Sequence, residues 1–540
     1  MTSPIFELAD EFITAQLKDH PVHATFVGVE SDRDFEDLGP AQKQADHERD
    51  KSALARLRDL PSTGKADDLA RLHMSERLEA GIAAHESGEW MRELRAPFGF
   101  AMTVNSYLQA IPRSDDESWS EFARRAEDFG QSFSTYRETL DTGLAAGKTA
   151  ARRQAVEAAA QARTYISGRS FDKFAAEYGD GPLKEKIATA LETVYSHLDS
   201  FATYLENDYA PKAPEADGVG EERYRVNARL LTGADLDPRE AYDWGWEELA
   251  RIEAEMDAEA EKILPGEGLD AVIDHLYKNE LVHGLDAYRA WLEETHETAF
   301  RMLDGVHFDI DPRLRSLDID VQTDSNSGAA SYMRPSEDLS RPGKTNWPVR
   351  GRESFATWDE LTTVFHEGVP GHHLQIGQLR VVGDGLSRFS KMHMPSSYTE
   401  GWALYAERLA DELGWFETPA TRLGMLTSAA VRAARVVIDI GIHCGYKRPD
   451  GSEWTFESAR EFLVERGRIA ADRARPEIVR YCGWPGQAIC YKLGERAWIA
   501  GRDEAKRRQG AAFDLKTWHT NALNAGPVGL DNLTELLADA

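Results

Sequence analysis

Two segments rich in histidine and glutamate carry the residues of this chain that are best suited to bind a metal ion. Residues 366–373 read His-Glu-Gly-Val-Pro-Gly-His-His, and Glu400 follows 27 residues after His373 within Tyr-Thr-Glu-Gly-Trp-Ala-Leu-Tyr-Ala-Glu. Two neutral imidazole nitrogens, one carboxylate ligand and a second carboxylate acting as a base are the components of a catalytic zinc site. The sequence therefore predicts one zinc ion bound by these two segments.

The spacing of the histidines differs from the common zinc-protease pattern His-Glu-x-x-His, in which both ligands lie on one helical face. Here the second histidine is His372 or His373, six or seven residues after His366. In an unbroken helix His373 would lie about 10.5 Å further along the axis, which is far for a shared metal ion. Pro370 cannot donate its amide and clashes with the preceding turn, so we expect the helix to bulge or break there. Such a distortion favours His372 as the ligand, with His373 as the alternative.

The same residues have purely structural interpretations. The segment 366–373 could be a kinked helix with incidental polar residues, and Ser397-x-x-Glu400 is typical of a capping box that opens a helix. Capping and ligation are compatible, because a glutamate in the first turn projects outward. Glu400 follows the histidines and is therefore the leading third ligand. Glu407 lies two turns further on the same face, where we expect it to hold a ligating histidine in place.

Helix dominates the rest of the sequence. Long stretches rich in Ala, Glu and Arg predict helices at roughly 117–147, 151–166 and 184–206. Asp237-Pro-Arg-Glu240 has an N-cap residue, a proline at the first helical position and a glutamate at the third, and predicts a helix that runs to about Ile263. The expected fold class is mainly α.

One region departs from helix, and it lies just before the histidine segment. Alternating patterns predict three short strands at 306–310, 317–321 and 329–333. A small sheet at about 306–334 would precede a metal-binding helix at about 357–380, opened by a capping box at Thr357-Trp-Asp-Glu360. This order suits peptide hydrolysis, because an extended substrate hydrogen-bonds to an edge strand. Tyr332 is accordingly a candidate for substrate binding, although the strands could equally be parts of the core.

The 540 residues are enough for several domains or one large one. The segment 207–222 collects proline, glycine and acidic residues and is the best candidate boundary. We therefore expect an N-terminal helical region at 1–210 and a zinc-binding catalytic region at 222–540, packed around a cleft.

Composition excludes several classes of partner. The net charge is −30, which argues against nucleic acid and anionic membranes. No apolar run approaches 18 residues, so no membrane span is expected, and the N-terminus lacks the features of a signal peptide. The three cysteines show no paired spacing and are expected to be reduced thiols in a cytoplasmic protein. Composition does not fix an oligomeric state.

These segments resemble the bacterial family called domain of unknown function 885. Members of this family carry a His-Glu-x-x-Pro-Gly-His-His segment followed by Glu-Gly-Trp-Ala-Leu-Tyr-Ala-Glu. The resemblance extends over nearly the whole chain, through Pro21–Gly28, Asp237–Glu240 and Trp484–Gly494. The family is grouped with gluzincin-type metallopeptidases, which are mostly helical enzymes, and this grouping implies a large helical gluzincin-like fold. It also implies a zinc ion held by His366, His372 and Glu400, with Glu367 as the general base.

The resemblance suggests further site residues. Tyr491 is the first candidate for donating a hydrogen bond to the oxyanion of the transition state, although it could be an ordinary core tyrosine. His443 is the second candidate, because Arg435, Asp439 and His443 recur every fourth residue along one helical stripe. Asp439 would then support His443, and the alternative is an ordinary ladder of surface ion pairs.

The function expected from these residues is zinc-dependent cleavage of peptide bonds, mainly in short peptides. Zinc would activate a water molecule, and Glu367 would take its proton as the general base. Arg480 and Tyr481 are candidates for binding a substrate carboxylate. The alternatives are a metal-dependent amidohydrolase or esterase that acts on a non-peptide substrate, and a catalytically inactive helical binding protein.

Overall fold

The computed structural model of this chain describes residues 3–323 and 329–540, which fold into two compact units. Unit 1 is formed by the chain up to Ser62, by Leu78–Val226 and by Pro476–Pro485. Unit 2 is formed by Thr63–Arg77, Asn227–Arg475 and Gly486–Ala540. The mainly α fold predicted from the sequence is confirmed.

The chain crosses between the units at five points, three of which lie inside helices. These are α4 (Lys65–Ser87), α10 (Glu221–Thr232) and α20 (Ala471–Gly483). The boundary predicted at 207–222 lies just before the crossing in α10. Each unit therefore combines stretches that are far apart in the sequence.

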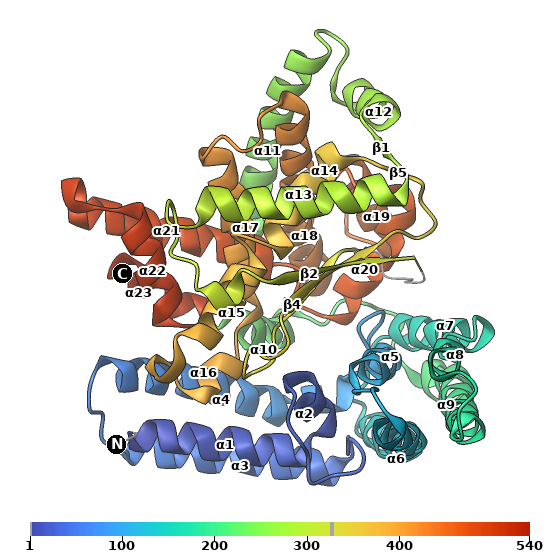
Figure 1. Cartoon of the computed structure of the whole chain (residues 1–540). Helices are drawn as coiled ribbons and strands as arrows, with labels where there is room; N and C mark the ends of the chain where they lie inside the picture. Colours follow the sequence, from blue (N-terminus) through green and yellow to red (C-terminus); the bar gives the residue numbers. More distant parts are fainter. Residues whose placement is uncertain (1–2, 324–328) are drawn as a thin grey trace. The chain divides into compact units, whose positions relative to one another are not determined.

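Unit 1 is built from helices, drawn mostly in blue to green in Figure 1. Those that lie wholly within it are α1 (Pro4–Asp19), α2 (Pro21–Val27), α3 (Pro40–Asp59), α5 (Phe100–Ala110), α6 (Asp116–Ala146), α7 (Arg152–Ser167), α8 (Asp172–Tyr178) and α9 (Lys184–Tyr204). Helices α6, α7 and α9 correspond to the three Ala-, Glu- and Arg-rich stretches. The long α6 begins at a capping box formed by Asp115 and Ser118 and ends at Gly147, whose backbone is left-handed.

Unit 2 contains the remaining helices and the strands. Its helices are α11 (Pro238–Ile263), α12 (Leu269–Asn279), α13 (Leu285–Leu303), α14 (Thr357–Glu367), α15 (His372–Val381), α16 (Arg388–Met392), α17 (Ser396–Glu412), α18 (Pro419–Cys444), α19 (Phe456–Glu465), α21 (Cys490–Gln509), α22 (Leu515–Ala525) and α23 (Leu530–Ala538). Helix α11 begins and ends as predicted. Its first turn is capped by the Asp237 carboxylate, which accepts hydrogen bonds from the amides of Arg239 and Glu240.

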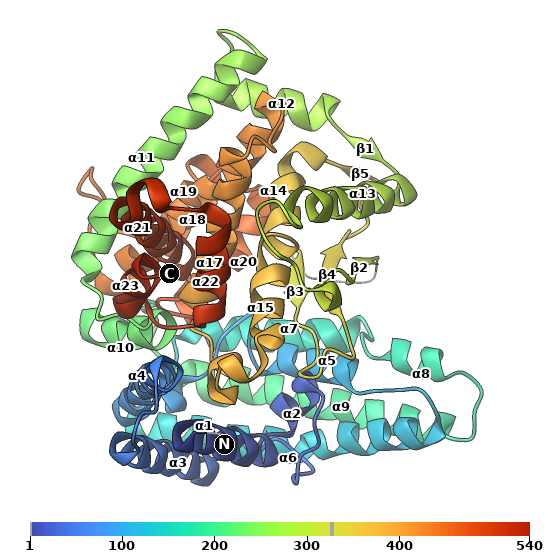
Figure 2. The same ribbon diagram turned by 60° about the vertical axis from the view of Figure 1, so that its left-hand side comes forward.

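The strands of unit 2 form two small sheets. Strand β1 (Val282–His283) pairs with β5 (Ser354–Phe355). The other sheet has the order β2 (Leu317–Gln322), β4 (Gly343–Pro348), β3 (Ser331–Met333). Its central strand β4 is parallel to β2 and antiparallel to β3, and it was not predicted from the sequence. Strand β3 is therefore an edge strand, and in Figure 2 it lies with β4 beside α15.

One predicted strand and both predicted capping boxes are wrong. Residues 306–308 all direct their amides at the carbonyl of Leu303, at 2.9–3.1 Å, so this segment closes the end of α13 rather than pairing in a sheet. Helix α14 has Ala356 as its N-cap, and α17 has Pro395, so Thr357 and Ser397 lie within the first turns. Neither side chain can cap from that position.

A hydrophobic cluster joins the sheet to the helix that carries the histidine segment. Its buried members are Tyr288 and Leu292 of α13, Val321 of β2, Trp347 of β4, and Val349, Phe355 and Val364. Figure 1 shows α13 running across strands β2 and β4. Each large apolar side chain buried in this way contributes about 1.5–3 kcal/mol. The cluster therefore fixes α14, which carries Val364, against the sheet.

In the part of the chain that the structure describes, no helix combines the length and apolar composition required to cross a bilayer. Cys444, Cys482 and Cys490, which all lie in the described residues, form no disulfide.

Candidate metal centre

A break between two helices brings two of the predicted ligands together. Helix α14 ends at Glu367, so His366 lies in its last turn, and α15 begins at His372. The intervening residues 368–371 turn the chain, and the imidazole rings of His366 and His372 have centroids 4.8 Å apart. The break predicted at Pro370 is confirmed, and the metal-binding helix predicted at about 357–380 is two helices.

The turn between α14 and α15 requires a glycine at position 371. A Cβ atom there would lie 2.0 Å from the carbonyl oxygen of His366 and 2.3 Å from that of Phe365. The backbone therefore passes its own helix end more closely than any side chain permits. The proximity of His366 and His372 depends on this close approach.

We expect Gly371→Ala to reduce zinc affinity by about tenfold or more, because the added methyl group forces the turn open and moves the histidines apart. Titration against a chromophoric chelator measures the affinity, and circular dichroism checks that the helices are retained. Gly64→Ala is the matched control, since nothing lies within 4 Å of a Cβ atom there. Wild-type affinity in a folded Gly371→Ala protein would contradict this account.

Three side chains with metal-binding atoms converge at the break. Nε2 of His366 lies 3.5 Å from Oε2 of Glu400, and Nε2 of His372 lies 3.6 Å from the same oxygen. Ligands of a tetrahedral zinc ion are separated by roughly 3.3–3.5 Å, so these two distances suit a metal between them. The ligand atoms of all three residues lie within 4.8 Å of one another, and no second group of this kind occurs in residues 3–323 and 329–540.

The Glu400 side chain carries an acceptor that the surrounding protein does not satisfy. Its Oε2 is buried and makes no hydrogen bond to any described residue. A buried carboxylate oxygen without a hydrogen bond costs free energy, and a metal ion would remove that cost. Glu400 is positioned by close packing of α17 on α21, where a Cβ atom on Gly401 would lie 2.4 Å from Cα of Gly494. A larger residue at either position would separate the two helices.

Glu407 orients His366 through Nδ1, the ring nitrogen that does not face Glu400. Its Oε1 lies 2.7 Å from Nδ1 of His366, and its other oxygen accepts a hydrogen bond from the Thr362 hydroxyl. This contact directs Nε2 of His366 towards Glu400, as in carboxylate–histidine–metal arrangements. The structure places Glu407 in the supporting position that the sequence predicts.

The electrostatic field at the centre favours a positive charge. Burial opposes charge on His366, but Glu400, Glu407 and Glu367 outweigh it and raise the pKa of His366 to about 9. Burial likewise raises the pKa of Glu400, but His366 and His372 lower it further, so that its net shift is downward. Glu367 is 8% exposed and follows His366 directly. The carboxylates therefore create a site that attracts a cation.

His373 points away from the three converging residues. Its Nε2 donates to the carbonyl of Leu314 at 2.7 Å, which leaves Nδ1 to accept from the hydroxyl of Tyr332 at 3.1 Å. Burial lowers the pKa of His373 to about 4. The structure thus brings His372 into the centre and uses both nitrogens of His373 elsewhere. Tyr332 of β3 lies beside the centre, with its ring centroid 6.4 Å from that of His372.

Tyr491 lies against a candidate ligand. Its ring is stacked on that of His366 with centroids 6.5 Å apart, and the guanidinium of Arg435 lies 4.8 Å from the Tyr491 ring centroid. Arg435 comes from α18 and Tyr491 from α21, so two helices position this phenol. The position is compatible with donation of a hydrogen bond to a substrate oxygen.

His443 and Asp439 are buried within α18. The two side chains are 0% exposed, and Nε2 of His443 lies 3.8 Å from Oδ1 of Asp439. Oδ2 of Asp439 accepts a hydrogen bond from the amide of Gly486 at 3.0 Å. Asp439 therefore anchors the segment that leads into α21. The alternative of a surface ion-pair ladder does not hold, because both side chains lie in the interior.

Arg480 and Tyr481 belong to unit 1, whereas the candidate metal centre belongs to unit 2. Oε2 of Glu477 lies 2.8 Å from Nη2 of Arg480 and accepts a hydrogen bond from the Tyr481 hydroxyl at 2.7 Å. These side chains therefore already bind a carboxylate within their own helix.

Sequence reasoning missed two arginines, Arg334 and Arg380, whose charges act on Tyr332 beside the centre. Arg380 follows His373 by seven residues on α15, and Arg334 follows Tyr332 by two residues at the end of β3. These are the helical and strand repeats that place side chains on one face. The spacing of each arginine from Tyr332 or His373 was the available signal. It indicates a shared site only when β3 and α15 are known to be neighbours.

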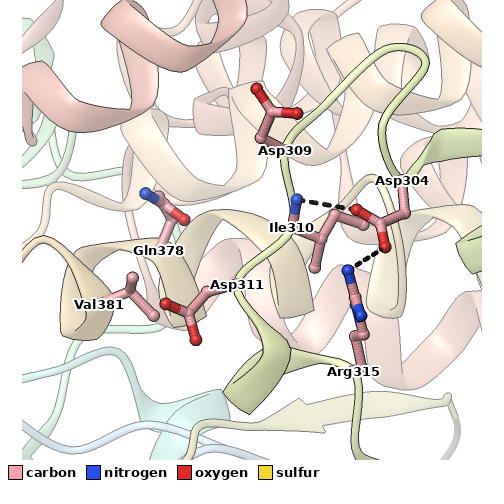
Figure 3. A pocket seen from close by; sticks show the side chains of 7 residues that line it. All are labelled: Asp304, Asp309, Ile310, Asp311, Arg315, Gln378 and Val381. Carbon is pink, nitrogen blue, oxygen red and sulfur yellow. Dashed lines mark hydrogen bonds and ion pairs between the residues drawn. The ribbon is translucent and has the colours of Figure 1, made fainter.

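A pocket in unit 2, shown in Figure 3, includes none of the three converging residues in its lining. It is lined by Asp304, Asp309, Ile310, Asp311, Arg315, Gln378 and Val381. Its carboxylates are engaged: Asp304 pairs with Arg315 at 2.5 Å and Asp309 with Lys516 at 2.6 Å. Asp311 caps the short helical turn at 312–314. The pocket is thus an ion-paired surface feature.

Comparisons with known proteins agree on the family and the fold. The model of a family described as "Bacterial protein of unknown function (DUF885)" matches residues 21–537. A crystal structure titled "putative lipoprotein" from Colwellia psychrerythraea is 21% identical, with 99% of each chain covered and a TM-score of 0.87. A second structure, titled "putative lipoprotein of unknown function" from Shewanella oneidensis, is 17% identical, with 99% of this chain and 100% of that chain covered and a TM-score of 0.76. No curated protein matches the sequence.

Proposed function

This chain belongs to the bacterial family of unknown function DUF885, and we propose that it is a zinc-dependent hydrolase that cleaves peptide bonds in short peptides. The observation that carries the proposal is the convergence of His366, His372 and Glu400 around a buried carboxylate oxygen that lacks a hydrogen bond. Two histidines and one glutamate are the ligand set of gluzincin metallopeptidases, and we assign the chain to that class on this basis.

The donor set suits zinc better than the common alternatives. Calcium and magnesium prefer six or more oxygen ligands, and iron–sulfur or copper(I) sites require thiolates. Here two of three donors are imidazole nitrogens, and three protein ligands leave a coordination position for substrate or water. A zinc ion held there would act as a Lewis acid on the scissile carbonyl and would lower the pKa of water to about 7.

The surrounding side chains supply the other requirements of amide hydrolysis. Glu367 takes a proton from the attacking water as the new carbon–oxygen bond forms, and returns it to the amine nitrogen as the carbon–nitrogen bond breaks. Tyr491, stacked on His366, donates a hydrogen bond to the carbonyl oxygen as it gains negative charge. Glu407 keeps His366 in the correct tautomer throughout.

The edge strand β3 supports a peptide as the substrate. In the described residues β3 pairs with β4 on one side only, and Tyr332 at its centre contacts His373 next to the ligand His372. An extended peptide can add to such an edge through main-chain hydrogen bonds, which do not depend on the side chains of the substrate. Short peptides of varied sequence are therefore the proposed substrates.

The test combines metal analysis with a survey of substrates. Purified protein should contain one zinc per chain by plasma emission spectrometry, and a mixture of synthetic peptides should yield defined fragments by mass spectrometry. Incubation with a chelator should abolish cleavage, and added zinc should restore it. Protein without stoichiometric zinc, or zinc-loaded protein that cleaves no peptide in the mixture, would overturn the proposal.

A cytoplasmic location remains part of the proposal. The reduced state of Cys444, Cys482 and Cys490 supports it, because disulfides form in oxidising compartments. The titles of the two similar structures each use the words "putative lipoprotein" for those proteins, and a lipoprotein need not be cytoplasmic. Cell fractionation of the native host with detection of this chain distinguishes the two locations.

A further inference from the structure

Two arginines, Arg334 and Arg380, whose charges act on Tyr332, form no ion pair with a carboxylate within residues 3–323 and 329–540. Arg380 is 6% exposed, its Nε makes no hydrogen bond to the described residues, and both of its terminal nitrogens lie 3.8 Å from Sδ of Met392. Arg334 is partly buried. A sulfur atom is a weak acceptor, so the charge of Arg380 is buried without adequate compensation.

The two arginines lie on chain segments, the end of β3 and α15, that a hydrogen bond from Tyr332 to His373 connects. Tyr332 and Arg334 are two residues apart at the end of β3, and His373 and Arg380 are two helical turns apart on α15, so each pair shares a face. The hydrogen bond from Tyr332 to His373 joins strand and helix at the level of the metal centre. Helical side chains lean towards the N-terminus of their helix, which directs Arg380 back towards this contact.

The charges around Tyr332 have one sign. Burial raises the pKa of its phenol, and the charged groups that oppose this shift are Arg334, Arg341 and Arg380. Burial lowers the pKa of Arg380 to about 10, and repulsion from Arg334 adds to the effect. Glu337 also acts on Arg380, but its carboxylate forms a two-point ion pair with Arg388 at 2.8 and 3.0 Å. The arrangement therefore favours an additional anion.

We propose that Arg334 and Arg380 bind a carboxylate of the substrate, specifically the C-terminal carboxylate of a short peptide. This inference rests on the proposed peptidase function and adds a substrate class to it. Guanidinium groups form paired hydrogen bonds to carboxylates. In a chain with a net charge of −30, a local group of cations is required to attract an anionic substrate.

The position of the arginines also sets the bond that is cleaved. Two residues of extended chain separate Arg334 from Tyr332, a distance of about 7 Å. A peptide that runs along β3 with its carboxylate at the arginines would place its reacting carbonyl one or two residues from the C-terminus. We therefore expect single residues or dipeptides to be released from the C-terminal end.

Measuring the binding of small probes tests this inference independently of peptide cleavage. The zinc-loaded Glu367→Gln protein, which should bind without cleaving, is titrated by calorimetry with N-acetyl-Ala-Ala and with its C-terminal amide. We expect the acid to bind about tenfold or more tightly than the amide. N-acetyl-Ala-Asp amide is the third probe, and it distinguishes a terminal carboxylate from one on a side chain.

Substitution of each arginine tests whether Arg334 and Arg380 cause the preference for the acid over the amide. In the same Glu367→Gln background, Arg380→Met and Arg334→Met should each reduce the preference for the acid to about twofold or less, with little change in affinity for the amide. Methionine keeps most of the buried stem, and replacing an uncompensated buried charge by an apolar side chain is often neutral or stabilising. Arg289→Met, an exposed position on α13, is the matched control and should retain the full preference.

The outcomes are distinguishable. Equal affinity for acid and amide, failure of both to bind, or a preference that survives in both folded arginine variants would overturn the inference. Tighter binding of the aspartate amide than of the acid would overturn the assignment to the C-terminus. If the protein cleaves peptides without any preference for the acid, the proposed function stands and this inference fails. If it prefers the acid but holds no zinc and cleaves nothing, the proposed function fails and the anion site stands.

Discussion

Glu367→Gln is expected to lower kcat for peptide cleavage by about 10²–10⁴-fold, the contribution typical of a general base. Gln has nearly the same shape as Glu but cannot accept the proton of the attacking water. Glu367 is not one of the three converging ligand residues, so the variant should still bind one zinc per chain. Steady-state kinetics on a cleaved peptide and metal analysis of the same sample measure the two quantities.

The matched control is Glu353→Gln, which removes an exposed carboxylate from the loop before β5 and should leave kcat unchanged. Two results would contradict the assignment. A Glu367→Gln enzyme with the wild-type rate would show that another group acts as the base. A Glu367→Gln protein that loses its zinc would show that Glu367 is a ligand, which would revise the ligand set.

The adjacent histidines should respond very differently to the same substitution. His372→Gln should lose zinc affinity by more than the 10–100-fold that removal of an outer partner typically costs, because it removes a ligand. His373→Gln should retain zinc, because its ring bonds to Leu314 and Tyr332 instead. It should lower the free energy of unfolding by about 1–3 kcal/mol through the loss of buried hydrogen bonds.

Glu407→Gln provides an intermediate point in this series. Glu407 contacts Nδ1 of His366 and is 3% exposed, so its replacement should reduce zinc affinity by about 10–100-fold. Chelator competition on the three variants and the wild type should thus give a graded order of affinities. Loss of zinc in His373→Gln with retention in His372→Gln would reverse the assignment of the second ligand.

Most residues of the candidate site could be predicted from short stretches of sequence. His366, Glu367 and Glu400 are recognisable by type, and Pro370 requires a break because a ring without an amide proton cannot continue a helix. The mainly α fold and the start and end of α11 follow from the same kind of local preference. These features depend on residues within a few positions of one another, so the sequence displays them directly.

Local patterns failed where a distant partner decides the conformation. Residues 306–310 alternate like a strand, but their first three amides bond to Leu303 at the end of the preceding helix. Strand β4 was not predicted, because its position between β2 and β3 depends on hydrogen bonds to both of these strands.

The sequence alone indicated a candidate metal-binding group of two histidines and a glutamate, and a break in the helix that carries the histidines. Only the tertiary structure decided that His372 joins the group while His373 turns to Leu314 and Tyr332. It also placed Tyr491 on His366 and Arg334 near Arg380. The physical reason is that backbone preferences act between neighbours in the chain. The choice between adjacent imidazoles depends on acceptors and donors that folding brings from other helices and strands.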